Sequence, residues 1–122
     1  MNSVKRCLVC LVFAVTAFSQ GRVRPPASIT CSRDDLTAHT GRITAYSRTD
    51  SHLTMTLRTD ADTMERFSVK LPVKMRIGEA EFTPQDWKTV ELSKGKLKPA
   101  VRATVWECKG GDRQIDWQPP RE

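Results

Sequence analysis

Three short segments of alternating apolar and polar residues follow one another between residues 41 and 71, and they restrict the fold more than any other feature of the sequence. Successive side chains of a β-strand point to opposite faces of the sheet, so this alternation indicates strands with one buried face. A helix would need apolar residues three and four positions apart, and these segments do not supply them. The predicted buried positions are Ile43 and Ala45 in the first strand, Leu53, Met55 and Leu57 in the second, and Phe67, Val69 and Leu71 in the third.

Short polar turns connect the three strands. Residues 49–51 (Thr-Asp-Ser) and 60–64 (Asp-Ala-Asp-Thr-Met) have the length and composition of antiparallel hairpin loops. We therefore predict a three-stranded meander with one apolar face. Such a face does not make a stable domain alone, so further elements must cover it.

The later part of the chain supplies those elements. Residues 73–82 predict a hairpin that turns at Gly78, and Thr83, Pro84 and Asp86 have the properties of a helix start. Residues 94–98 predict a loop. The alternation over residues 101–108 predicts a strong strand, followed by a turn at 109–112 and a short last strand at 114–117.

The first 19 residues are typical of a secretory signal peptide: a basic start, a run of about a dozen apolar residues, and small residues at positions 17 and 19. The alternative, a membrane anchor, is disfavoured because a span needs roughly 20 apolar residues. We therefore predict a signal peptide at 1–19, a flexible lead-in at 20–30, one domain at 31–118 and a free tail at 119–122. The expected location is periplasmic or secreted.

Removal of the signal peptide leaves a chain of about 100 residues, enough for one small domain with a limited core. Cleavage after Ser19 would remove two basic residues, so the formal net charge would fall from +6 to +4. This modest excess favours anionic partners weakly and does not by itself indicate nucleic acid.

Two cysteines remain in the predicted mature chain, Cys31 and Cys108. In an exported protein such a pair predicts a disulfide, here closing a loop of about 78 residues. The alternative is a metal site that also uses His39 and His52, but the separations match no compact zinc pattern. We predict no metal and no cofactor.

The predicted elements indicate a mainly all-β fold. Five or six short strands with one short helical turn are typical of a small antiparallel barrel of the oligonucleotide/oligosaccharide-binding (OB) type, closed or partly open.

A resemblance to a known family is visible in five stretches: Gly41-Arg-Ile, Leu53-Thr-Met-Thr-Leu, Met75-Arg-Ile-Gly-Glu-Ala-Glu-Phe, Asp86-Trp and Leu97-Lys-Pro-Ala-Val-Arg-Ala-Thr-Val. Together they resemble small exported bacterial OB-like β-barrels, domains of unknown function. The chain has Ala100 where that pattern often carries glycine. The resemblance covers about residues 41–105; it implies the fold and export, and no catalytic residues carry over.

Catalytic motifs are absent from the sequence. It has no Gly-x-Ser-x-Gly elbow and no His-Glu-x-x-His, and both histidines, His39 and His52, lie in polar surroundings. The carboxylates of residues 60–65 are too few for a calcium loop and suit a solvated turn better. We predict that the protein is not an enzyme.

The polar face of the meander is the candidate binding surface. OB-type barrels bind single strands through cationic grooves and stacking aromatic side chains. An ordinary solvated strand face has a similar composition, so that alternative stays open. The candidate residues are Arg42, Tyr46, Arg58, Arg66 and Lys70, joined by Arg102 and Trp106 if the later strand enters the sheet.

The tryptophans are expected to differ in exposure. We predict that Trp87 packs under the helical turn, that Trp117 caps the core, and that Trp106 is exposed. The expected function is a non-enzymatic binding or structural module of the bacterial cell envelope. Its expected partner is anionic: a glycan, a lipid head group or another envelope protein. The alternative is a secreted barrel that binds single-stranded oligonucleotides, which export disfavours.

Overall fold

The computed structural model describes residues 25–120. The predicted signal peptide at 1–19 lies outside the described residues, as do residues 20–24 of the lead-in and 121–122 of the tail.

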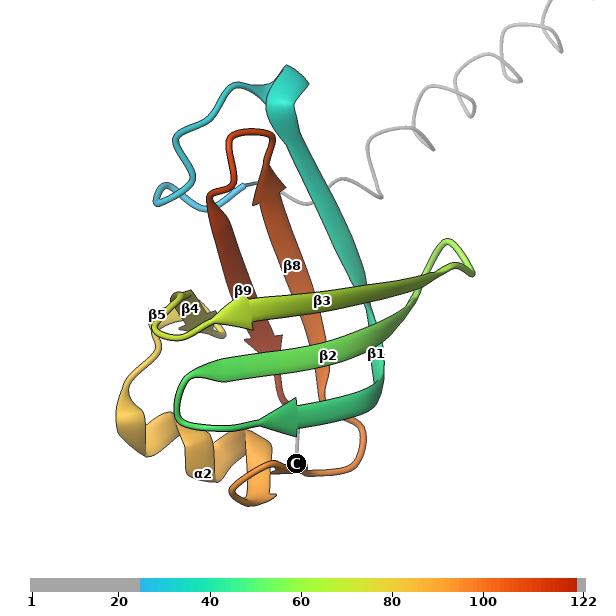
Figure 1. The fold of residues 1–122 in the computed structure, drawn as a ribbon, viewed down its shortest axis with the longest axis vertical. Helices are drawn as coiled ribbons and strands as arrows, with labels where there is room; N and C mark the ends of the chain where they lie inside the picture. The colour runs from blue at the N-terminus through green and yellow to red at the C-terminus, as the bar shows by residue number, and fades with distance from the viewer. Residues whose placement is uncertain (1–24, 121–122) are drawn as a thin grey trace, which may run out of the picture.

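Residues 25–120 are mainly β-structure with one short α-helix, as predicted (Figure 1). The elements are η1 (Arg33–Asp35), β1 (Leu36–Arg48), β2 (His52–Thr59), β3 (Met64–Lys70), β4 (Lys74–Ile77), β5 (Ala80–Glu81), η2 (Pro84–Asp86), α2 (Trp87–Val90), β6 (Glu91–Ser93), β7 (Lys96–Leu97), β8 (Arg102–Cys108) and β9 (Arg113–Gln118).

Seven strands form one sheet in the order β3-β2-β1-β8-β9-β4-β5, and β6 and β7 form a separate hairpin. Neighbouring strands are antiparallel except for β4 and β9, which are parallel. Closure into a five- or six-stranded barrel is not confirmed, because the sheet has seven strands and its two edges do not pair. The interruption between β3 and β4 has a simple cause. Pro72 lies between these two strands and has no backbone N–H to donate to a neighbouring strand.

β1 belongs to both halves of the sheet. Its residues 36–42 pair with β8 and its residues 41–48 pair with β2, so β1 starts five residues before the predicted strand. Figure 1 shows β1 running down the molecule and then bending, while β2 and β3 cross in front of β8 and β9. Gly41 pairs with both neighbouring strands, and the close approach of β2 requires a glycine there, because a Cβ would lie 2.1 Å from the carbonyl oxygen of Arg58.

Replacing Gly41 with alanine is expected to lower the free energy of unfolding by about 2–3 kcal/mol, because the new methyl group meets backbone atoms that cannot move aside. Urea unfolding measures the change. Gly110→Ala is the matched control: a Cβ there meets nothing within 4 Å, and its effect should stay below about 0.5 kcal/mol. Equal effects at the two positions would contradict the close approach of β1 and β2 at Gly41.

The core lies between the two halves of the sheet. The predicted apolar face of β2 is confirmed, since Leu53, Met55 and Leu57 are at most 1% exposed. They belong to one cluster with side chains from the other strands and the helix: Phe67, Val69, Val90, Val101, Ala103, Val105, Ile115 and Trp117.

The helical turn starts where it was predicted. Pro84 occupies the first position of η2, and the backbone N–H of Thr83 donates to Asp86 Oδ2 at 2.7 Å. The following region was predicted as a loop and is instead the β6–β7 hairpin. Gly95 allows its tight turn, with a φ of 82° that disfavours other residues.

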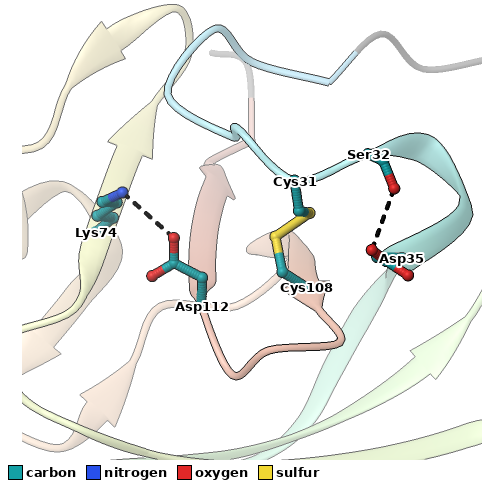
Figure 2. Close-up of a disulfide and its surroundings, with 6 residues drawn as sticks. All are labelled: Cys31, Ser32, Asp35, Lys74, Cys108 and Asp112. Atoms are coloured by element: carbon teal, nitrogen blue, oxygen red, sulfur yellow. Dashed lines mark hydrogen bonds and ion pairs between the residues drawn. A yellow bond between two sulfur atoms is a disulfide. The ribbon is translucent and has the colours of Figure 1, made fainter.

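The predicted disulfide joins Cys31 to Cys108, with their Cα atoms 6.0 Å apart (Figure 2). It ties the segment before η1 to the end of β8. The described part of the lead-in also contacts the sheet: Pro26 is buried, and Ser28 Oγ donates to Gln114 Oε1 of β9 at 2.5 Å.

Candidate functional site

Cationic side chains gather on the outer face of β1, β2, β3 and β8. Alternation places them opposite the core: the buried residues of β2 are Leu53, Met55 and Leu57, so Arg58 points outward. We call this surface the cationic face. It comprises Arg42, Arg58, Arg66, Lys70 and Arg102, five of the seven predicted binding residues.

Three of these arginines lie side by side. In the register of the sheet Arg42 pairs with Arg58 on one side and with Arg102 on the other. Side chains that are directly opposite have Cβ atoms about 4.5–5.5 Å apart, and like charges in such pairs repel. We call these three residues the arginine row.

The β2–β3 turn supplies carboxylates to both ends of the arginine row. Arg102 Nη2 lies 2.7 Å from both carboxylate oxygens of Asp60, and Arg58 Nη2 lies 2.6 Å from Asp62 Oδ1. These contacts explain the acidic turn without calcium. Arg42, in the middle, forms no ion pair with any described residue.

The prediction that Tyr46 lies on the polar face is wrong. The pairing of β1 with β2 shifts between Ile43 and Ala45, which leaves Thr44 as an extra residue. Such a β-bulge turns the following side chains to the other side of the strand. Tyr46 therefore points inward and meets the ring of Trp117 edge-on, with ring centroids 6.2 Å apart.

The prediction that Trp106 is exposed is also wrong. Trp106 does lie on the side of β8 away from the core cluster, yet only 2% of its surface is accessible. Its indole N–H donates to Asp116 Oδ2 at 2.9 Å. Gln114, its partner on β9, receives the hydrogen bond from Ser28, so the lead-in reaches this side of the sheet. Neither predicted aromatic residue is available for stacking.

A buried ion pair that the sequence did not predict lies at the helical end of the sheet. Glu91 accepts two hydrogen bonds from Arg48, at 2.8 and 2.6 Å, and one from the Tyr46 hydroxyl at 2.5 Å. The guanidinium of Arg48 also lies over the ring of Trp87, 3.9 Å from its centroid. Every polar group here has a partner, so this cluster holds α2 and β6 against β1 and leaves no vacant binding position.

Burial and hydrogen bonding shift the pKa values in this cluster. Burial raises the pKa of Tyr46 far above its ordinary value of 10, and the Glu91 carboxylate adds to the shift. Burial also acts to raise the pKa of Glu91, but hydrogen bonds from Arg48 and Tyr46 outweigh it, and the net shift is downward. At neutral pH Glu91 is therefore ionised and Tyr46 is protonated.

Neither histidine forms a catalytic pair with a carboxylate in the described part of the chain. His52 Nδ1 lies 3.0 Å from Ser51 Oγ. His39 packs against Phe67, with ring centroids 5.6 Å apart, beside a surface hollow of about 570 Å³ that Asp60 and Glu65 also line. No hydrogen bond joins His39 to either carboxylate among the described residues.

Other hollows mark the surface of the described residues. One of about 550 Å³ lies between Ser28 and β4, one of about 370 Å³ lies beside Cys108 and the β8–β9 turn, and one of about 220 Å³ lies between residues 43–46 and 97–101. Across residues 25–120, no group of three or more His, Cys, Asp or Glu side chains is placed to hold a metal ion. Within the same range, no helix has the length and apolar character that crossing a membrane requires.

Comparison with known proteins gives no relative. No protein-family model matches the chain, and neither the curated proteins nor the solved structures include a match. No family membership follows from these comparisons.

Proposed function

We propose that this chain is a non-enzymatic binding module of the bacterial cell envelope, exported by its N-terminal signal peptide, and that its partner is an anionic envelope component. The observation that carries the proposal is the register that aligns Arg58, Arg42 and Arg102 across three strands. Two of the five cations on this face have carboxylate partners, so the face keeps an excess of positive charge.

The disulfide supports the proposed location. Disulfides form and persist in oxidising compartments such as the periplasm or the cell exterior. The Cys31–Cys108 bond therefore agrees with a periplasmic or secreted protein.

The proposal includes an OB-type arrangement of strands. β1 pairs with both β2 and β8, and β4 runs parallel to β9. β3 and β4 follow one another after only three residues, so we treat them as two segments of one strand that would bring the ends of the sheet together. A short helix between this strand and β8 fits the same arrangement.

The oligonucleotide alternative is weaker on this surface. Proteins that bind single strands combine cationic grooves with exposed aromatic side chains. Here Tyr46 points inward and Trp106 is buried, so neither offers a ring to a base.

Charge reversal on the cationic face tests the proposal. The double variant Arg66→Glu/Lys70→Glu is expected to bind a sulfated dextran about tenfold more weakly than the wild type, because two attractive contacts of about 1 kcal/mol or less become repulsive. Affinity is measured by titration at fixed ionic strength. Both side chains are exposed and lie on β3, so the fold should persist.

The matched control is Lys88→Glu/Lys96→Glu, which has the same net charge but changes exposed lysines of α2 and β7. Its affinity should fall less than threefold, because exposed charges beyond about 10 Å are screened at 0.1 M salt. Equal losses in the two variants would show that only net charge matters and would contradict a binding face. A steep salt dependence of oligothymidylate binding would instead favour the nucleic-acid alternative.

A further inference from the structure

The arginine row concentrates positive charge that the fold itself does not neutralise. Arg58, Arg42 and Arg102 are direct neighbours on adjacent strands, an arrangement that costs stability through repulsion. Asp62 and Asp60 offset this repulsion at the two ends. The middle position, Arg42, has no carboxylate partner among residues 25–120, so the uncompensated charge lies at the centre of the row.

The two aspartates are held beside the row by the β2–β3 turn. The backbone N–H of Asp60 donates to the carbonyl oxygen of Thr40 on β1, and that of Asp62 donates to the carbonyl oxygen of Thr59, both at 2.9 Å. The hydroxyl groups of Thr59 and Thr63 lie 2.7 Å apart across the turn. Both carboxylates are exposed, and exposed ion pairs are weak enough for an incoming anion to replace them.

Three arginines on adjacent strands suit a tetrahedral anion better than a carboxylate. One guanidinium fork can satisfy both oxygens of a carboxylate, as Arg48 and Glu91 illustrate. A phosphate or sulfate group has three or four oxygens that point in different directions. It can accept hydrogen bonds from neighbouring guanidinium groups at once, and Arg is the side chain that suits such contacts.

We infer that the arginine row is a binding site for a phosphate- or sulfate-type oxyanion, with Arg42 as its first contact. Asp60 and Asp62 compete with this ligand for Arg102 and Arg58 and so set its affinity. The inference rests on the proposed function in one respect, because the row is part of the cationic face.

Titration of the oxidised protein with inorganic phosphate tests the inference, with sodium chloride at matched ionic strength as the reference. Chemical shifts of the arginine side-chain N–H groups report binding at the row. Arg42→Gln is expected to weaken phosphate binding at least tenfold, because it removes the one charge of the row that has no carboxylate partner among the described residues. Asp60→Asn/Asp62→Asn is expected to strengthen it about tenfold, because the flanking arginines lose their competitors. Asn also tolerates the φ of 66° at position 62.

Lys88→Gln is the matched control. It removes an exposed cation of α2, outside the cationic face, so phosphate affinity should change less than threefold. Amide spectra of all variants check that the core is unchanged. Phosphate that moves no signal of the row overturns the inference, and so does an Asp60→Asn/Asp62→Asn variant whose affinity does not rise.

Binding to vesicles of phosphatidylglycerol and of phosphatidylcholine distinguishes a lipid head group from a soluble or glycan-borne oxyanion. Binding to the first only, weakened by Arg42→Gln, assigns the site to a lipid head group. Phosphate binding without vesicle binding assigns it to a soluble or glycan-borne oxyanion. Vesicle binding that Arg42→Gln leaves unchanged overturns the inference. If Arg66→Glu/Lys70→Glu weakens dextran binding but phosphate has no effect at the row, the inference is rejected and the proposed function stands. If dextran binding is not weakened and phosphate has no effect, both the inference and the proposed function are rejected.

Discussion

Replacing Cys31 and Cys108 with serine is expected to lower the free energy of unfolding by about 4 kcal/mol. The bond closes a loop with a sequence separation of 77, for which the chain-entropy model gives about 4.5 kcal/mol at 25 °C. Domains of this size have a total stability of roughly 5–15 kcal/mol, so most of the margin would be lost. Urea unfolding of the oxidised wild type and of the double variant measures the difference.

Reductant provides the internal control for this prediction. It should destabilise the wild type by about the same amount as the double variant and should leave the variant unchanged. Figure 2 shows why the effect is expected to be global, since the bond attaches the segment before β1 to the end of β8. A double variant as stable as the oxidised wild type would contradict a contribution of the disulfide to the fold.

Replacing Arg48 with methionine is expected to cost about 3–5 kcal/mol, the usual penalty for leaving one partner of a buried ion pair without the other. Glu91 would keep only Tyr46 and the backbone N–H of Gly95, 3.3 Å away. Its side chain is 3% exposed, so water cannot replace the guanidinium. Arg66→Met is the matched control, because this exposed arginine should cost less than about 0.5 kcal/mol.

Two further measurements separate the ion pair from simple packing. The double variant Arg48→Met/Glu91→Leu should lose less stability than Arg48→Met, because no charge stays buried alone. The pKa of Glu91 is lowered in the folded state, so its contribution is complete above its ordinary value of 4.5 and is lost as the pH falls through the lower folded value. An Arg48→Met effect that is independent of pH in this acidic window would contradict the assignment.

The meander was predictable because its signal is local. Leu53, Met55 and Leu57 alternate with polar residues within one strand. Because successive side chains point to opposite faces, this pattern places all three on the same, buried face. The outward positions of Arg58, Arg66 and Lys70 follow from the same alternation.

The side on which Tyr46 lies was not predictable in this way. The bulge at Thr44 leaves no mark in the alternation of residues 42–46, and one extra residue reverses the face of all that follow. Trp106 illustrates a different limit. Alternation placed it correctly on the side away from the core cluster, but alternation does not give its burial to 2% exposure. Ser28, which hydrogen-bonds to its partner Gln114 on this side of the sheet, is 86 positions away from Gln114 in the sequence.

The buried ion pair could not be predicted from local sequence either, because its two residues come from distant segments. Arg48 and Glu91 are 43 positions apart, and charged side chains of both types are ordinarily exposed. Their meeting depends on the bend of β1 and on the placement of α2 next to the end of β1, where Arg48 lies over Trp87 (Figure 1).

The sequence by itself determined the strands of the meander, the helix start, the disulfide pair and the outward cations, because each depends on side-chain alternation, capping or cysteine content within short segments. Only the tertiary structure decided that three arginines align in one row, that Tyr46 turns inward and that Trp106 is covered. These features depend on strand register and on contacts between distant segments, where a shift of one residue reverses every side chain.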